Sequence, residues 1–200
     1  MPRLPLTAGA VLTIAILGAG AARVSAAEWQ IKPFLGATYG GSATYIAVPP
    51  DGARAHLVFG ASGMLLGEFL GVEGDVGHTS GFFQDANFPL VTDSGVTTTT
   101  GNVVVALPRH LAEYSLRPYL VGGAGVMHIE IDYQLLPSIS STLKTMDLGA
   151  GVTGFLTKHL GVTWDVRYFR TIDRTIETGQ SVGSEHLSFW RANMALAIRL

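Results

Sequence analysis

The chain has 200 residues, no cysteine and a formal net charge of −2 at pH 7. The lack of cysteine excludes disulfides and a lipid-modified cysteine, and the slight acidic excess weighs against a nucleic-acid partner. Twenty-five glycines weigh against long helices, although 48% of the residues are hydrophobic. Strands that expose apolar side chains to lipid would explain this combination, and so would a soluble β-protein that buries them.

Residues 1–26 are predicted to be a cleavable secretory signal peptide. Arg3 supplies the positive charge, residues 6–22 the apolar stretch, and Val24-Ser25-Ala26 a small-residue cleavage site. A transmembrane anchor is the alternative, but the abrupt change to an alternating pattern at Trp29 favours a signal peptide. Its removal would leave residues 27–200, predicted to form one domain.

The first half of that domain predicts four strands of period-two alternation. They cover residues 29–40, 54–66, 70–77 and 97–107. In the third, Glu73 and Asp75 lie on one face and Val72 and Val76 on the other. A tight turn at Gly67-Glu68 joins the second strand to the third, whereas residues 41–53 and 79–96 are predicted to be long loops.

Residues 116–133 (LRPYLVGGAGVMHIEIDY) form the longest alternating segment. Odd positions from Tyr119 to Tyr133 are apolar or small, and even positions become polar at His128, Glu130 and Asp132. We therefore expect the odd positions to face lipid and the even positions to face a lumen. The length suits a tilted strand that crosses a bilayer core of about 30 Å and continues beyond it.

Three further strands follow, at residues 143–156, 160–169 and 186–200. The count is therefore eight, and long and short connections alternate. Lipid offers no water to satisfy the hydrogen bonds of an open sheet edge, so such strands must close into a barrel. The fold class predicted is an all-β, eight-stranded antiparallel up-and-down transmembrane β-barrel.

Several segments carry a family resemblance: GVEGDVGH (71–78), TGNVVVALP (100–108), RPYLVGGAGV (117–126) and DLGAGVTGFLTKHLGVTWDVRYF (147–169). With the terminal amphipathic strand, they resemble the OmpA/OmpX-type outer-membrane barrels, especially the opacity-protein and general outer membrane protein β-barrel group. The resemblance implies a Gram-negative outer membrane, contacts with its lipid and lipopolysaccharide, and no cofactor. It also implies recognition of the last strand by the barrel-assembly machinery, although this strand ends in Leu200 where the family usually has an aromatic residue.

The predicted inward faces carry a set of charges near mid-barrel. An eight-stranded barrel is just wide enough for side chains to fill it, so these charges are expected to pair across the lumen. A gated narrow pore or proton path is the alternative. The charges are Glu73, Asp75, Asp147, Asp165, Arg167 and Arg191.

Two other groups of residues are assigned by position. His128, Glu130 and Asp132 are expected at the lumen mouth; their spacing could suit a metal, but any amphipathic strand produces such trios, and no metal is predicted. The second group is an aromatic girdle expected to face lipid. Its members are Trp29, Tyr39, Tyr119, Tyr133, Trp164, Tyr168 and Trp190.

One motif suggests an enzyme. His186-Leu187-Ser188 resembles the His-x-Ser motif of outer-membrane lipid A deacylases, but no acid follows Ser188, so no catalytic residue is assigned. The function expected is a non-enzymatic outer-membrane anchor whose outer loops recognise or adhere to a host or surface ligand. A narrow porin-like channel and a lipid A-modifying hydrolase are the alternatives.

Overall fold

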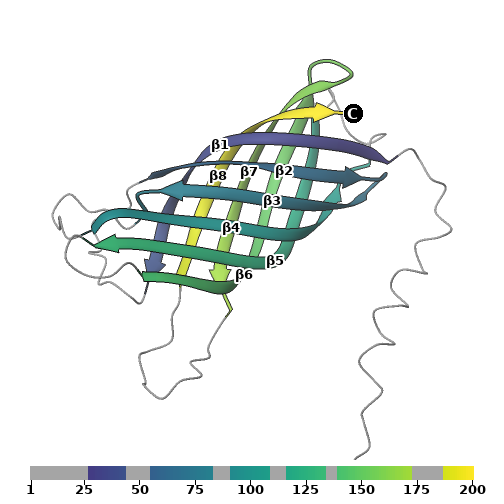
Figure 1. Cartoon of the computed structure of the whole chain (residues 1–200). Helices are drawn as coiled ribbons and strands as arrows, with labels where there is room; N and C mark the ends of the chain where they lie inside the picture. The colour runs from purple at the N-terminus through teal and green to yellow at the C-terminus, as the bar shows by residue number, and fades with distance from the viewer. Residues whose placement is uncertain (1–26, 44–54, 83–90, 109–115, 134–138, 173–186) are drawn as a thin grey trace, which may run out of the picture.

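The computed structural model describes residues 27–43, 55–82, 91–108, 116–133, 139–172 and 187–200. Eight antiparallel strands pair in sequence order, and β1 pairs with β8 to close a barrel (Figure 1). The strands are β1 (Glu28–Ala43), β2 (His56–Leu66), β3 (Leu70–Ser80), β4 (Val91–Ala106), β5 (Leu116–Tyr133), β6 (Ile139–Phe155), β7 (Leu160–Thr171) and β8 (Leu187–Arg199). The predicted fold class is confirmed, and the predicted signal peptide lies outside the described residues.

No helix in the described part of the chain is long and apolar enough to span a membrane.

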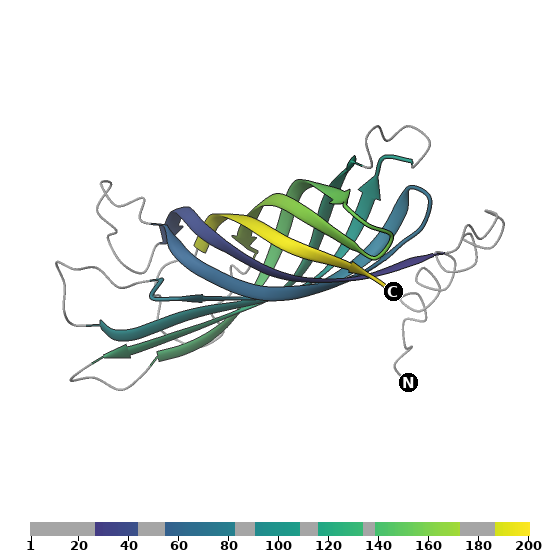
Figure 2. The same cartoon turned by 90° about the horizontal axis from the view of Figure 1, so that it is seen from above.

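The strand bounds differ from the prediction mainly on either side of β5. β4 begins at Val91 and β6 at Ile139, both in polar segments that the sequence pattern assigned to loops. The reason is the length of β5, because Tyr133 pairs with Val91 and Ile131 with Ile139. β4, β5 and β6 together form a wall that extends beyond the other strands (Figure 2).

The two ends of the barrel differ in their connections. Residues 67–69, 107–115 and 156–159 join strands at the end where β1 begins and β8 finishes, called here the turn end. The connections at the opposite, loop end are residues 44–55, 81–90, 134–138 and 172–186, and all but 134–138 are longer than any at the turn end. At the turn end, the Arg117 guanidinium donates to the carbonyls of Gly67 at 2.9 Å, Glu68 at 2.7 Å and Leu107 at 3.0 Å. One side chain thus ties two turns together.

In seven of the eight strands, the side chains that face outward and inward are the ones that the sequence pattern predicts. Trp164 is 57% exposed on the outer wall, whereas Arg167 on the same strand is 1% exposed inside the barrel. Glu73 is likewise buried, and Val72 beside it faces outward. Apolar side chains therefore cover the outside of the cylinder and charged ones fill it, the inverse of a water-soluble protein.

β5 has the opposite orientation to the one predicted. Tyr119 is 5% exposed and faces the lumen, as do Val121 and Met127, whereas Leu120 is 61% exposed outside. Near Tyr119 both faces of the strand are apolar or small, so alternation alone does not distinguish them. The register does, because Val121 lies opposite Val104 and so shares its inward face.

The residues of β5 nearest the loop end explain why the predicted orientation of this strand was wrong. There Ile129 is buried inside the barrel and Glu130 is outside, which is the arrangement expected of a strand in water. The prediction instead assumed that the face carrying the isoleucines meets lipid along the whole strand. The outer face of β5 therefore changes from apolar or small residues between Leu120 and Val126 to polar ones at His128 and Glu130, whereas its inward face remains apolar or small from Tyr119 to Ile129.

Glycines on the inward faces make room for large side chains. A Cβ at Gly151 would lie 2.6 Å from the Tyr119 ring, and one at Gly149 would lie 2.7 Å from Cγ of Arg167. In contrast, a Cβ at the outward-facing Gly74 or Gly101 would meet no atom within 4 Å. The inward glycines are therefore required by packing.

This contrast predicts opposite outcomes for two Gly→Ala variants. Gly151→Ala should lower the free energy of unfolding by about 1–3 kcal/mol, because the new methyl group overpacks the lumen against Tyr119. Gly101→Ala, in the middle of β4, should leave it within about 0.5 kcal/mol. Urea unfolding of each variant refolded into lipid vesicles, followed by tryptophan fluorescence, measures both. Equal losses would contradict the proposed crowding.

Candidate functional site

The structure places all six predicted lumen charges inside the barrel, and all are buried. It adds Lys32 of β1, whose ammonium group is also buried there. Among the described residues this central layer holds four carboxylates and three cations, a formal charge of −1. The carboxylates are Glu73, Asp75, Asp147 and Asp165, and the cations are Lys32, Arg167 and Arg191.

Glu73 is the centre of the layer because it accepts from cations on two other strands. Lys32 Nζ donates to Oε2 at 2.7 Å, and Arg167 Nη1 donates to Oε1 at 2.7 Å. Arg167 Nη2 also donates to Asp165 Oδ2 at 3.1 Å. The pairs join β1, β3 and β7, which are not all neighbours in the sheet. Removal from water is costly for each charge, and pairing compensates for that cost.

Arg191 lies on the side of the charged layer that is nearest the loop end. Its Nη2 donates to Asp75 Oδ1 at 2.7 Å. Its guanidinium carbon also lies 4.9 Å from the centre of the Phe34 ring and 4.6 Å from that of Phe169. Cations are attracted to aromatic faces most strongly where water is absent. Arg191 therefore connects the charged layer to the aromatic residues beside it.

Asp147 makes a longer ionic contact than the other three carboxylates of the layer do. Its Oδ2 is 3.9 Å from Arg167 Nη1. When the Asn102 amide is oriented to match its donors and acceptors, its nitrogen donates to Asp147 Oδ1 at 2.9 Å and its oxygen accepts from Arg167 Nη1 at 3.1 Å. Asn102 of β4 thus links Asp147 of β6 to Arg167 of β7.

Apolar clusters lie on both sides of the charged layer. The cluster toward the loop end contains Val96, Met127, Ile129, Leu143, Phe169, Leu187 and Phe189. The cluster toward the turn end contains Met64, Leu66, Val104, Ala106, Tyr119 and Val121. An ion crossing the barrel would have to pass both clusters and separate the ion pairs between them.

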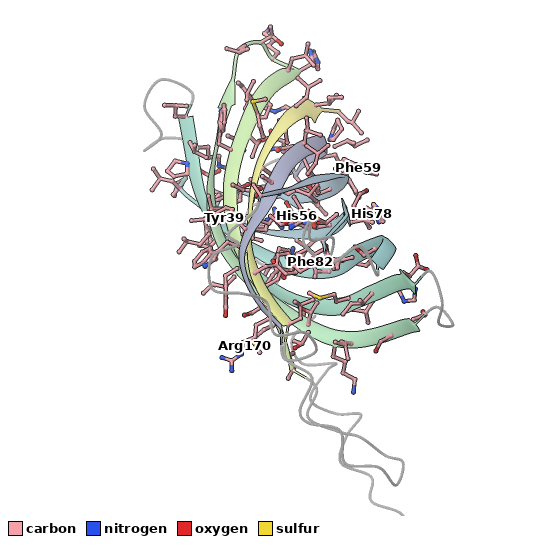
Figure 3. The ribbon with its side chains drawn as sticks, turned by 90° about the vertical axis from the view of Figure 1, so that its left-hand side faces the viewer. Tyr39, His56, Phe59, His78, Phe82 and Arg170 are labelled. Carbon is pink, nitrogen blue, oxygen red and sulfur yellow. The ribbon has the colours of Figure 1, made fainter. Side chains whose placement is uncertain are left out.

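Phe82 packs over the cluster at the loop end. Its ring centroid is 5.3 Å from that of Phe189 and 5.6 Å from that of His56. Figure 3 shows Phe82 and His56 within the ring of strands, and Phe59 and His78 at its side. Phe82 therefore packs on the rim of the barrel.

The expected lumen-mouth group is placed differently. His128 and Glu130 lie on the outer wall, with side chains 42% and 66% exposed, so their assignment to the mouth is wrong. His128 Nε2 is 3.2 Å from Glu130 Oε1, and His128 Nδ1 is 2.8 Å from Thr142 Oγ1. The Asp132 side chain lies outside the described set. The described residues contain no group of three His, Asp or Glu that could hold a metal ion.

The aromatic girdle requires one correction. Tyr119 faces the lumen, where its hydroxyl donates to Asp165 Oδ2 at 3.1 Å. The inverted face of β5 is the reason. The side chain of Tyr133 is not among those described. Five predicted members do lie on the outer wall: Trp29, Tyr39, Trp164, Tyr168 and Trp190.

The deacylase-like motif is only partly within the described chain. Ser188 begins the outer face of β8 and pairs in register with Arg170. His186 lies outside the described residues, so the structure does not define its position relative to Ser188.

Comparison with known proteins agrees with this architecture. The model of the outer membrane protein beta-barrel domain family matches residues 10–187. No curated protein sequence matches. Neisserial surface protein A (NspA) has a similar fold, with a TM-score of 0.59 and 11% identity over 84% of this chain and 95% of that one.

Two other solved structures are similar. OprG from Pseudomonas aeruginosa has a TM-score of 0.54 and 14% identity over 87% of this chain and 96% of that one. Ail, the attachment invasion locus protein of Yersinia pestis, was solved with the heparin analogue sucrose octasulfate. It has a TM-score of 0.51 and 14% identity over 86% of this chain and 99% of that one. The family match and the closed eight-stranded barrel together show that the chain is a bacterial outer-membrane protein and belongs to the outer membrane protein beta-barrel domain family.

Proposed function

We propose that the protein is a non-enzymatic anchor in the outer membrane, whose outer loops recognise or adhere to a host or surface ligand. Barrels of this type place short turns in the periplasm and longer loops outside the cell. The loop end, with connections 44–55, 81–90, 134–138 and 172–186, is then extracellular. Assembly through β8 by the barrel-assembly machinery is part of the same proposal.

The observation that carries the anchoring role is the packed lumen. Arg167, Arg191 and Lys32 are among the largest fully buried side chains, and their ion pairs tie opposite walls together. A conducting pore needs a hydrated path and weak binding along it. Side chains that are paired across the barrel and flanked by apolar clusters favour a stable plug instead.

Recognition is assigned to the outer loops because binding residues are commonly located on loops held by a rigid scaffold. One protein of similar fold is named for attachment and invasion, and its complex contains a heparin analogue. Adhesion is therefore a reasonable activity to test first. Replacement of each outer connection in turn by a short Gly-Ser linker, followed by measurement of bacterial binding to host cells, would identify the responsible loop. Unchanged binding in all four replacements would contradict the role.

Single-channel recording tests the anchor against the porin alternative. Purified protein in planar bilayers should give no conductance steps, because the charged layer and both apolar clusters occupy the lumen. Arg167→Ala should also be silent, since truncation leaves the clusters in place. Regular conductance steps of the unmodified protein, altered in Arg167→Ala, would support the channel.

Stability measurements test the structural role of the charged layer. Arg167→Met should lower the free energy of unfolding by about 3–5 kcal/mol, because it leaves Glu73 and Asp165 as buried charges that have lost a partner. Lys158→Met, in an exposed turn between β6 and β7, is the matched control and should change it by less than about 0.5 kcal/mol. Urea unfolding in lipid vesicles provides the measurement. A loss no larger than that of the control would show that the layer does not stabilise the barrel.

Lipid A mass spectrometry tests the hydrolase alternative. Cells that express the protein should keep the same acyl chains as cells that express Ser188→Ala, because no orienting acid follows Ser188 in the sequence. Loss of an acyl chain with the unmodified protein alone would establish the enzyme.

A further inference from the structure

The charged layer of the lumen contains one carboxyl group more than it contains cations. Among the described residues, four buried carboxyl groups face one lysine and two arginines. Apolar clusters close the lumen on both sides of the layer, so water cannot easily solvate the excess charge. A buried charge without compensation is costly. The layer is therefore expected to bind one further positive charge.

Asp147 differs from the other three carboxyl groups in its partners. Each of the other three accepts a hydrogen bond of 2.7–3.1 Å from a lysine or an arginine. In the described part of the chain, the cation within 4 Å of Asp147 is Arg167, whose Nη1 is 3.9 Å from Oδ2. The amide of Asn102 donates to Asp147 Oδ1, and a neutral carboxyl group can accept that bond as well as a carboxylate can. Asp147 is thus the carboxyl group whose charge is least stabilised.

Two carboxyl oxygens of the layer lack a hydrogen-bond partner among the described residues. They are Oδ2 of Asp75 and Oδ2 of Asp147, in residues that are 1% and 4% exposed. Both oxygens lie beside the same atom, Arg167 Nη1, at 3.8 Å and 3.9 Å. Buried polar atoms are normally hydrogen-bonded. A proton on Asp147 Oδ2 would make this oxygen a donor, and Asp75 Oδ2 could accept from it, so one proton accounts for both atoms.

The other charges of the lumen favour a neutral Asp147. Glu73 and Asp75 carry the same charge as an ionised Asp147 and would repel it. Lys32 donates to Glu73 and Arg191 to Asp75, each at 2.7 Å. The strands β2 and β4 contribute uncharged polar groups, such as those of Ser62 and Asn102. The ionisable groups around Asp147 are Lys32 on β1, Glu73 and Asp75 on β3, Tyr119 on β5, Asp165 and Arg167 on β7, and Arg191 on β8.

We propose that Asp147 binds a proton on Oδ2 in the folded barrel at mildly acidic pH, so that the charged layer is electrically neutral. The proton is taken from water on folding and forms one O–H bond. At pH 5.5 an aspartate in water is ionised, so the folded barrel binds one proton more than the unfolded chain does. Acidification therefore stabilises the barrel, and a rise in pH removes this contribution. The site is independent of any ligand of the outer loops.

Infrared spectroscopy of the folded full-length protein in lipid vesicles at pH 5.5 tests for this proton. The unmodified barrel should show the C=O stretch of a neutral carboxyl group, and Asp147→Asn should lose it. Asp165→Asn, which alters a carboxylate of the same layer, should keep the band. Absence of the band from the unmodified barrel, or its persistence in Asp147→Asn, would overturn the proposal.

The folding of the variant is itself informative. Asp147→Asn should fold, because an amide has the shape of the protonated group and the same lack of charge. Heat-modifiable gel migration reports whether the barrel has formed. Failure of Asp147→Asn to fold at pH 5.5, where the unmodified protein folds, would show that the charge is needed and would contradict the proposal.

The pH dependence of stability provides a second measurement. From pH 4.5 to pH 5.5, the equilibrium constant for urea unfolding of the unmodified protein, divided by that of Asp147→Asn, should rise about tenfold. The reason is that unfolding releases the Asp147 proton in the unmodified chain alone. A ratio that does not change with pH would overturn the proposal. So would a ratio that changes when choline replaces sodium at constant pH, because it would assign the extra positive charge to a metal cation.

Discussion

The buried ion pair between Glu73 and Arg167 is the interaction on which the interior depends. It joins β3 to β7 across the lumen, and Lys32, Asp165 and Asn102 contact one or both partners. In a closed barrel of eight strands, the number, stagger and tilt of the strands set the diameter. Bonds across the lumen add direct contacts between strands that are not neighbours in the wall. The same bonds occupy the space through which a solute would pass, and for this reason they also support the proposed anchoring role.

Much of this arrangement could be predicted from the sequence because the two sides of a barrel wall require different types of residue. Where one face is apolar and the other charged, as with Val72 and Glu73 or Trp164 and Arg167, alternation identifies the strand and its orientation. The six lumen charges were located in this way. The sequence did not predict which of these charges pair with one another. Pairing across a lumen depends on the tilt of each strand and on its position along the barrel axis, and the order of residues within one strand gives neither.

The errors have equally specific causes. The prediction of lumen charges missed Lys32. This residue shares the inward face of β1 with Gln30 and Phe34, and that alternation was the signal that could have placed it among the lumen charges. β5 was misjudged because its two faces near Tyr119 are similar in hydrophobicity. Its glycines do not resolve the ambiguity, because Gly122 faces outward whereas Gly123 and Gly125 face the lumen. Only the structure separates them: a Cβ at Gly123 or Gly125 would collide with Asn102 or the β4 backbone.

The change from an apolar to a polar outer face along β5 has a thermodynamic consequence. Toward the loop end, Ile129, Leu143 and Phe189 are enclosed by a wall whose outer side carries His128 and Glu130, so this part of the molecule is organised like a small water-soluble protein. Unfolded strands cannot remain in lipid, because their backbone groups would lack hydrogen-bond partners, so outward-facing side chains such as Leu148 and Trp164 leave water on folding just as the enclosed ones do. Both transfers contribute to the heat-capacity change of folding. The temperature dependence of folding should therefore originate in the outer wall as well as in the enclosed clusters.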